Sequence, residues 1–141
     1  MVRVADINDA EQLFILNEQF NGRDETTLNE IKESLLNNQQ ELIIVAEYNN
    51  TLVGFVCVQI KKSFCYSDVY AEITEVFVMD NYRRQKIASK MISFAEKWCI
   101  KNYKLHSFEL LTGKENIQAQ LLYSSLGYSI NNEILFSKKY E

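Results

Sequence analysis

The sequence predicts an α/β (α+β) layered domain, with a mixed and mostly antiparallel central sheet that helices cover on both faces. Helical and strand-like segments alternate along the chain, and an amphipathic helix buries its apolar stripe well against a sheet. The chain has 141 residues, of which 47% are hydrophobic. That length suffices for one domain with a core and is too short for two ordinary ones. We therefore expect a single domain over residues 1–141.

The N-terminal part reads as a strand followed by two helices. Residues 2–5 are prone to form a strand, and Asp6 or Asn8 can cap a helix with apolar residues at helical spacing. Thr27 can cap a second helix, with Glu30 placed three positions later for a capping box.

The middle of the chain reads as a hairpin and a third strand. Residues 42–48 and 52–60 are rich in β-branched and apolar residues, and the link at 49–51 is short and contains Asn. Such links favour an antiparallel hairpin. A polar and aromatic loop follows at 61–68, and the next strand covers 69–78.

The C-terminal half begins with a long helix over residues 84–101. Its apolar stripe consists of Ile87, Met91, Ala95 and Trp98, broadened by Ala88, Ile92 and Cys99. Residues 104–111 read as a strand, and 116–126 as a shorter helix that Gly127 can end. Residues 128–140 are expected to supply one or two closing strands.

Composition and charge exclude several classes of function. The 19 acidic and 15 basic residues give a formal net charge of −4, which argues against nucleic-acid binding and suits a cationic small molecule. We see neither a signal-peptide core nor an apolar run near the roughly 18 residues of a membrane helix. The three cysteines, an odd number without metal-ligand spacing, fit reduced thiols. We expect a cytoplasmic protein with no metal and no membrane partner.

A basic turn joins the strand at 69–78 to the long helix. A helix start exposes unpaired backbone N–H groups and the positive end of the helix dipole. Arg83, Arg84 and Lys86 add cationic side chains around it. Charge alone also fits an ordinary solvated helix start, but the position directly after a strand favours phosphate binding.

Two segments in the C-terminal half resemble the GNAT superfamily of acetyl-CoA-dependent N-acetyltransferases. Residues 83–88 read Arg-Arg-Gln-Lys-Ile-Ala, which is similar to the phosphate loop of that family, although Lys86 stands where the family has Gly. Residues 116–128 match the family's Asn-x-x-Ala-x-x-x-Tyr-x-x-x-Gly-Phe/Tyr segment at every marked position. The strand residues 72–78 resemble those of aminoglycoside 6′-N-acetyltransferase-like members.

The resemblance implies that the chain binds acetyl-CoA as a co-substrate. It implies a splayed strand whose free backbone groups at 76–78 pair with the pantetheine arm, and a helix start that holds the pyrophosphate. The implied cofactor-binding residues are Val76, Phe77, Val78, Arg83, Arg84, Gln85, Lys86, Ile87, Ala88, Ser89 and Asn116. As a bare sequence feature, Asn116 is a good helix-starting residue.

The resemblance also implies that Tyr123 is the general acid that protonates the departing thiolate. A phenol with an unperturbed pKa of about 10 is protonated at neutral pH and can donate that proton. Spacing alone favours a core position instead, because Tyr123 shares a helical face with Leu122 and Leu126.

Glu72 is our first candidate for the base that deprotonates the amine, and Glu75 is the alternative. Both lie on a strand expected inside the sheet, where a carboxylate is rare without a partner or a wet cavity. Strict alternation of side chains places Glu72, Thr74 and Val76 on one face and Glu75 on the other. Either carboxylate also fits a structural role, such as an ion pair with a lysine.

The remaining reactive residues fit structural roles. His106, the only histidine, has no triad partners in the pattern. Cys57, Cys65 and Cys99 are better read as packed thiols, because direct transfer to an amine needs no acyl-enzyme.

The combined hypothesis is an enzyme that moves the acetyl group of acetyl-CoA directly onto a primary amine of a small cationic acceptor, such as an aminosugar or a polyamine. Residues 21–24 and 61–68 are the expected substrate walls, because loops usually carry specificity. One alternative is a protein N-terminal or lysine acetyltransferase. Another is a non-catalytic acyl-CoA-binding regulatory module, which Lys86 keeps open. A homodimer is compatible with the sequence, which does not set the oligomeric state.

Overall fold

The computed structural model describes residues 1–140, and the chain divides into two compact units, Met1–Leu111 and Thr112–Glu141. They are called unit 1 and unit 2 below. The expectation that residues 1–141 form one domain stays a prediction.

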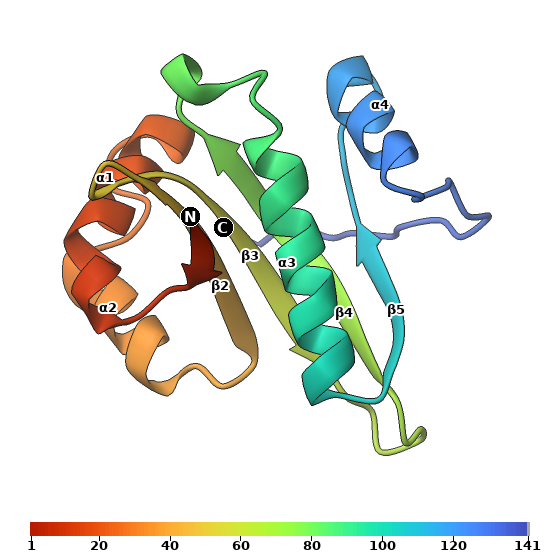
Figure 1. Cartoon of the computed structure of the whole chain (residues 1–141). Helices are drawn as coiled ribbons and strands as arrows, with labels where there is room; N and C mark the ends of the chain where they lie inside the picture. The colour runs from red at the N-terminus through yellow and green to blue at the C-terminus, as the bar shows by residue number, and fades with distance from the viewer. Residues whose placement is uncertain (141) are drawn as a thin grey trace. The chain divides into compact units, whose positions relative to one another are not determined.

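Unit 1 is a five-stranded sheet with helices on both faces (Figure 1). The strands lie in the order β1 (Val2–Val4), β2 (Glu41–Tyr48), β3 (Thr51–Lys61), β4 (Val69–Val78) and β5 (Leu105–Leu110). Neighbouring strands are antiparallel except β4 and β5, which are parallel. The helices of this unit are α1 (Ala10–Asn21), α2 (Leu28–Asn37) and α3 (Ile87–Asn102), with 3₁₀ turns η1 (Ile7–Asp9) and η2 (Asp80–Tyr82). The predicted mixed, mostly antiparallel sheet is confirmed.

The first helices begin where their caps predict. Asp6 accepts a hydrogen bond from the Asn8 N–H and forms a capping box ahead of η1, from which the chain continues into α1. At the start of α2, the Thr27 hydroxyl accepts from the Glu30 N–H at 3.1 Å, and the Glu30 carboxylate accepts from the Thr27 N–H at 3.2 Å. Both boxes satisfy N–H groups that a helix start leaves unpaired.

The predicted hairpin is also present. Asn49 and Asn50 have left-handed φ values of 54° and 62°, which asparagine tolerates better than most residues. Two such residues form the tight turn that suits the twist of paired strands. The pairing of β2 with β3 then runs from Tyr48↔Thr51 to Glu41↔Gln59.

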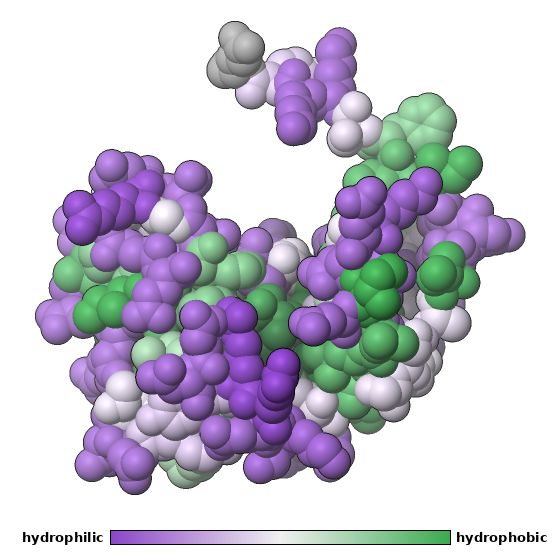
Figure 2. All heavy atoms as spheres, turned by 90° about the horizontal axis from the view of Figure 1, so that it is seen from above, coloured by the Kyte–Doolittle hydropathy of each residue, from purple (hydrophilic) through white to green (hydrophobic). Residues whose placement is uncertain are grey.

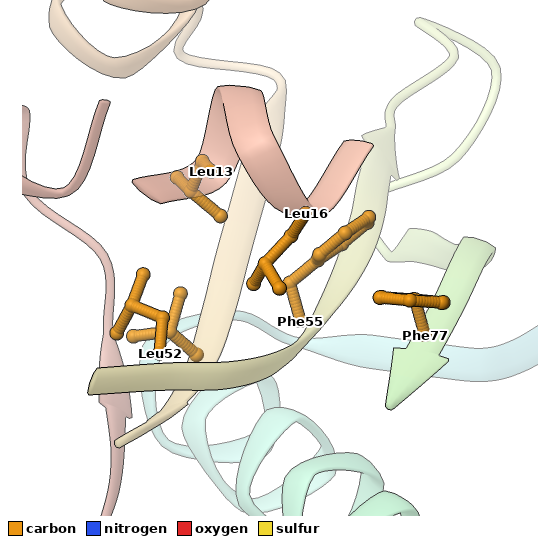
Figure 3. Close-up of a cluster of buried hydrophobic side chains, with 6 residues drawn as sticks. Leu13, Leu16, Leu52, Phe55 and Phe77 are labelled. Carbon is orange, nitrogen blue, oxygen red and sulfur yellow. The ribbon is translucent and has the colours of Figure 1, made fainter. Parts of the chain in front are cut away.

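One part of the core lies between α1 and the sheet (Figure 3). Leu13 and Leu16 project from α1 toward Leu52 and Phe55 of β3 and Phe77 of β4. The Phe55 and Phe77 ring centroids lie 5.8 Å apart. This packing holds α1 against one face of β3 and β4.

The opposite face of the sheet is covered by α3. Its buried residues are Ile87, Met91, Ile92, Ala95 and Cys99. The helix starts at Ile87, three residues later than predicted, because Arg84 and Lys86 adopt left-handed φ values that a right-handed helix excludes. Trp98, which the stripe included, is only half-buried.

Unit 2 contains the predicted short helix α4 (Ile117–Ser125). The Asn116 side chain caps it by accepting from the Ala119 N–H at 3.2 Å. At the other end Gly127 has a left-handed φ of 95°, and the Tyr128 N–H donates to the Tyr123 carbonyl at 3.0 Å. This is a Schellman ending, for which glycine is preferred.

The prediction of closing strands over residues 128–140 was wrong, since the structure assigns none to these described residues. Asn131, Asn132 and Glu133 have low strand propensity, and no other strand of unit 2 is present among its described residues to pair with. Hydrophobic side chains reach the surface of the molecule (Figure 2). In this segment they are Ile130, Ile134, Leu135 and Phe136, which are 67% to 95% exposed.

Candidate active site

Strand β4 contains an extra residue near its centre. Cys57 of β3 pairs with Glu75, but its neighbour Val58 pairs with Ile73, so Thr74 has no partner position on β3. Such a β-bulge shifts the alternation of side chains by one residue. The prediction that Glu72 and Glu75 lie on opposite faces was therefore wrong, and both lie on one face.

That face is the one that α1 covers. Phe77 packs in the cluster with residues of α1, and Glu75, two positions earlier, shares its side of the strand. Before the bulge, Glu72 pairs with Gln59 on β3, and Gln59 pairs with Glu41 on β2. Directly paired residues point to the same side of a sheet. The carboxylates of Glu41, Glu72 and Glu75, called the acidic face below, thus share one side.

Burial and the neighbouring carboxylates raise the pKa values of two groups on this face, Glu41 and Cys57. Burial, and then the charge of Glu75, raises the pKa of Glu41, while a hydrogen bond from Gln59 Nε2 to Glu41 Oε2 at 3.4 Å acts in the opposite direction. Burial followed by the charges of Glu41 and Glu75 raises the pKa of the Cys57 thiol well above its usual value. This environment favours the neutral thiol and disfavours a nucleophilic thiolate.

Glu72 is held by a lysine of the neighbouring strand. Lys61 Nζ lies 2.6 Å from Glu72 Oε1, and the two side chains are 52% and 21% exposed. The ion pair with a lysine, which was the structural alternative for this residue, is therefore present. A carboxylate in an ion pair can still accept a proton from an amine that replaces the lysine.

The second half of β4 has a free edge in unit 1. The pairing with β5 runs from Val69↔Leu105 to Ile73↔Leu110, so no described residue of β5 pairs with β4 beyond Ile73. Backbone groups of residues 76–78 that point to that edge can pair with an added extended ligand, except the Val78 carbonyl oxygen, which accepts a hydrogen bond from Arg83 Nε. The side chain of Phe77 packs in the core and is therefore not available to a ligand.

The turn after β4 presents an uncapped helix start. No side chain caps α3, and Lys86 at the N-cap position has a left-handed φ of 62°. The first N–H groups of the helix, at Ile87, Ala88 and Ser89, therefore remain available to an anion. Arg84, Gln85 and Lys86 are exposed beside them.

Arg83 makes two contacts within this turn. Its Nε donates to the Val78 carbonyl oxygen at 3.0 Å, and its Nη1 lies 2.9 Å from Asp80 Oδ1. The guanidinium thus ties the end of β4 to η2, which leaves Arg84 and Lys86 as the cations not paired to a carboxylate among the described residues of the turn.

Tyr123 and Asn116 belong to unit 2. Burial raises the pKa of the Tyr123 phenol, which keeps it protonated at neutral pH. Its ring packs edge-on against Tyr128, with 6.2 Å between centroids.

The histidine and two of the cysteines lie in different environments. His106 is exposed, and its Nδ1 lies 3.9 Å from Asp68 Oδ2. Cys65 is exposed, whereas burial raises the pKa of Cys99 to about 11.

Sequence reasoning missed Glu41 of the acidic face and two residues that contact that face, Gln59 and Lys61. A signal was available for two of them, because Gln59 and Lys61 alternate with Ile60 at the end of a strand that is otherwise apolar. Glu41 becomes relevant only through the register of β2 with β3.

The sequence pattern of the Acetyltransferase (GNAT) family matches residues 8–128. The chain belongs to the GNAT acetyltransferase family. This confirms the family and the enzyme class that the two segments indicated. None of the curated protein sequences matches the chain.

Solved structures share the GNAT fold over nearly the whole chain. AAC(6')-Iy in complex with the bisubstrate analog CoA-S-monomethyl-acetylneamine has a TM-score of 0.86 and 19% identity, covering 99% of this chain and 97% of its own. The aminoglycoside acetyltransferase meta-AAC0020 from an uncultured soil metagenomic sample has a TM-score of 0.85 and 18% identity, covering 100% and 95%. The ribosomal-protein-alanine N-acetyltransferase from Brucella melitensis biovar Abortus 2308 has a TM-score of 0.84 and 13% identity, covering 99% of each. At these identities the likeness shows the fold.

Two further features bear on the class of site. Within residues 1–140, no cluster of three or more His, Cys, Asp or Glu is arranged to hold a metal ion. None of the helices described there has the length and apolar character needed to cross a membrane.

Proposed function

We propose that this GNAT protein transfers the acetyl group of acetyl-CoA directly to a primary amine of a small cationic acceptor, such as an aminosugar or a polyamine. The observation that carries this proposal is the bulge at Thr74, which gathers Glu72 and Glu75 with Glu41 on one side of the sheet. A group of carboxylates attracts protonated amines, and the net charge of −4 acts in the same direction.

The free edge of β4 and the start of α3 support acetyl-CoA as the co-substrate. Backbone groups of Val76, Phe77 and Val78 are proposed to pair with the pantetheine arm as an added strand. The proposed pyrophosphate site combines the α3 N–H groups of Ile87, Ala88 and Ser89 with the side chains of Arg83, Arg84, Gln85 and Lys86. Asn116 of unit 2 is proposed as a further cofactor-binding residue. AAC(6')-Iy, which shares the fold, is known in complex with CoA.

Glu72 is proposed as the base. A protonated amine that meets its carboxylate gives up a proton, and the neutral nitrogen then attacks the carbonyl carbon of the thioester. The new C–N bond forms as the C–S bond breaks. Glu75 is the alternative base, because the bulge places it on the same face.

Tyr123 is proposed as the acid. As the C–S bond breaks, the thiolate takes the phenolic proton. The nitrogen of the new amide releases its second proton to solvent, from which the phenolate is reprotonated. The raised pKa of Tyr123 keeps its proton in place at neutral pH before the transfer. No thiol of the chain is needed as a nucleophile, which agrees with the raised pKa of Cys57.

A protein acceptor is the second candidate. It is favoured by the fold shared with a ribosomal-protein-alanine N-acetyltransferase. Peptides with a free α-amine, tested beside diamines and aminosugars, separate the two acceptor classes.

We also propose a cytoplasmic location, because all three cysteines are unpaired. The homodimer stays a prediction.

The experiment that tests the proposal is a thermal melt with and without acetyl-CoA, followed by a thiol-release assay across the three acceptor classes. We expect a higher Tm with acetyl-CoA, since a ligand that binds only the folded state stabilises it. We also expect thiol release that depends on a small cationic amine. A melt shift without release from any amine would favour the non-catalytic binding module instead, and no shift would contradict acetyl-CoA binding.

A further inference from the structure

The lysine on Glu72 occupies the position that the proposed acceptor needs. Lys61 Nζ lies 2.6 Å from Glu72 Oε1, which is the distance of a strong charge-assisted hydrogen bond. A base must lie within hydrogen-bond reach of the amine that it deprotonates. Two ammonium groups at one carboxylate repel each other, so a bound acceptor weakens or displaces the contact of Lys61 with Glu72.

The position of Lys61 allows its ammonium group to separate from Glu72 and to pair with it again. It is the last residue of β3, where it pairs with Tyr70, and its side chain reaches across to Glu72 on the same face of the sheet. Half of the side chain is exposed, so its ammonium can exchange the carboxylate for water at modest cost. Glu72 is only 21% exposed, so its carboxylate is less well solvated than that of a surface residue and favours a cation in place of the one that leaves.

We propose that Lys61 sets the affinity for the acceptor by acting as an internal competitor at Glu72. This inference rests on the proposed function and names a residue that tunes it. An acceptor ammonium that binds Glu72 replaces one cation with another, so the net electrostatic gain is small. Removal of the lysine charge takes away the ion-pair partner that Glu72 has among the described residues, and a cationic acceptor then binds more tightly.

The chain offers a matched control in the next residue. Lys62 Nζ donates to the backbone carbonyl oxygens of Ser63 and Tyr66, and it contacts no carboxylate among the described residues. Lys62→Met therefore removes the same charge from the same end of the sheet and leaves Glu72 paired. Lys61→Met keeps the apolar stem of the side chain and removes only its charge, whereas Lys61→Arg keeps a cation beside Glu72.

The test measures binding of 1,4-diaminobutane and glucosamine to CoA-saturated protein by calorimetry, together with kcat and KM for acetyl transfer to each amine. We expect Lys61→Met to lower Kd and KM about threefold to tenfold, as for the loss of a half-exposed ion pair. Lys61→Arg should stay within about twofold of the wild type. Lys62→Met should lower Kd and KM less than Lys61→Met does, because Lys62 lies in the expected 61–68 substrate wall but does not pair with Glu72. A merely structural role of Lys61 would not tighten binding of a cation.

The outcomes separate this inference from the proposed function. If the wild type acetylates the amines but Lys61→Met leaves Kd and KM unchanged or raises them, Lys61 is not a competitor and the proposed function stands. An equal effect of Lys62→Met would also overturn the inference, because it would reduce the result to general surface charge. If no variant binds or acetylates either amine, the small cationic acceptor itself is excluded, and the inference with it.

Discussion

Glu72 and Glu75 lie on the same face of β4, although an odd number of positions separates them, because Thr74 has no partner on β3. In a regular strand, residues at such a spacing point to opposite faces. The bulge therefore places the Glu75 carboxylate on the same face as Glu72. Glu41 of β2 adds a third carboxylate to this face. Bulges are frequent next to active sites, where they redirect a side chain.

Replacement of Tyr123 by Phe tests the proposed acid. We expect kcat with a responsive amine to fall about a hundredfold, because the thiolate loses its proton donor. The rise in Tm caused by acetyl-CoA should persist, since the ring is kept. Tyr128→Phe, which alters the neighbouring ring, is the control. Unchanged kcat in Tyr123→Phe would remove this residue from the mechanism.

The left-handed conformation of Lys86 predicts a stabilising substitution. A side chain at a φ of 62° costs about 1–2 kcal/mol, and glycine avoids this cost but loses part of the gain to its freedom in the unfolded chain. We expect Lys86→Gly to raise Tm by about 2–4 °C. Lys86→Ala removes the same charge and keeps the strain, so it should not raise Tm. Equal melts for the two variants would show that charge, and not conformation, governs this position.

Gly54 marks a close approach between β3, β4 and α3. A Cβ at this position would lie 2.6 Å from the Phe77 carbonyl oxygen and 3.1 Å from Met91 Cε. Because a backbone atom must move, Gly54→Ala should lower the free energy of unfolding by about 1–3 kcal/mol, measured by urea denaturation. Gly113→Ala is a suitable control, since the nearest atom to its Cβ is 3.9 Å away. Equal midpoints for both variants would contradict this packing.

The ion pair of Arg3 with Asp9 predicts acid sensitivity. Arg3 Nη1 and Nη2 each donate to the Asp9 carboxylate at 2.8 Å, and Asp9 is 4% exposed. This hydrogen bonding from Arg3 lowers the pKa of Asp9, despite its burial. Since the folded pKa lies below that of the unfolded chain, about 3.9, the ionised form stabilises the fold above that pH, and this stability is lost as the pH falls through the folded pKa.

Melts between pH 7 and pH 3 should therefore distinguish Asp9→Asn from the wild type. The variant is expected to be less stable at pH 7, and its Tm should fall less steeply below about pH 4. Asp24→Asn, at an exposed position with a left-handed φ, is the control and should follow the wild type. Parallel curves for Asp9→Asn and the wild type would contradict the assigned role.

Much of unit 1 was predictable because its signals are local. The capping box of Thr27 and Glu30 fixes the start of α2, and Asn49 and Asn50 fix the hairpin. Each depends on residues only a few positions apart. The two family segments likewise lie within short stretches, so the GNAT family could be inferred from the sequence.

The features that escaped prediction depend on partners distant in sequence. The bulge at Thr74 exists only in the register of β4 against β3, and Glu41 joins the acidic face only through the register of β2. The left-handed residues Arg84 and Lys86 delay α3, although both have good helix propensity. Periodicity within one segment contains none of this information.

The most direct test of the central claim is thiol release with a saturating diamine and acetyl-CoA, compared among the wild type, Glu72→Gln and Glu75→Gln. We predict that kcat falls about a hundredfold or more in Glu72→Gln and much less in Glu75→Gln, while both variants keep the Tm shift caused by acetyl-CoA. A large loss in Glu75→Gln alone would move the base to that residue. Wild-type turnover in both variants would contradict the account of the acidic face as the place where the acceptor amine loses its proton.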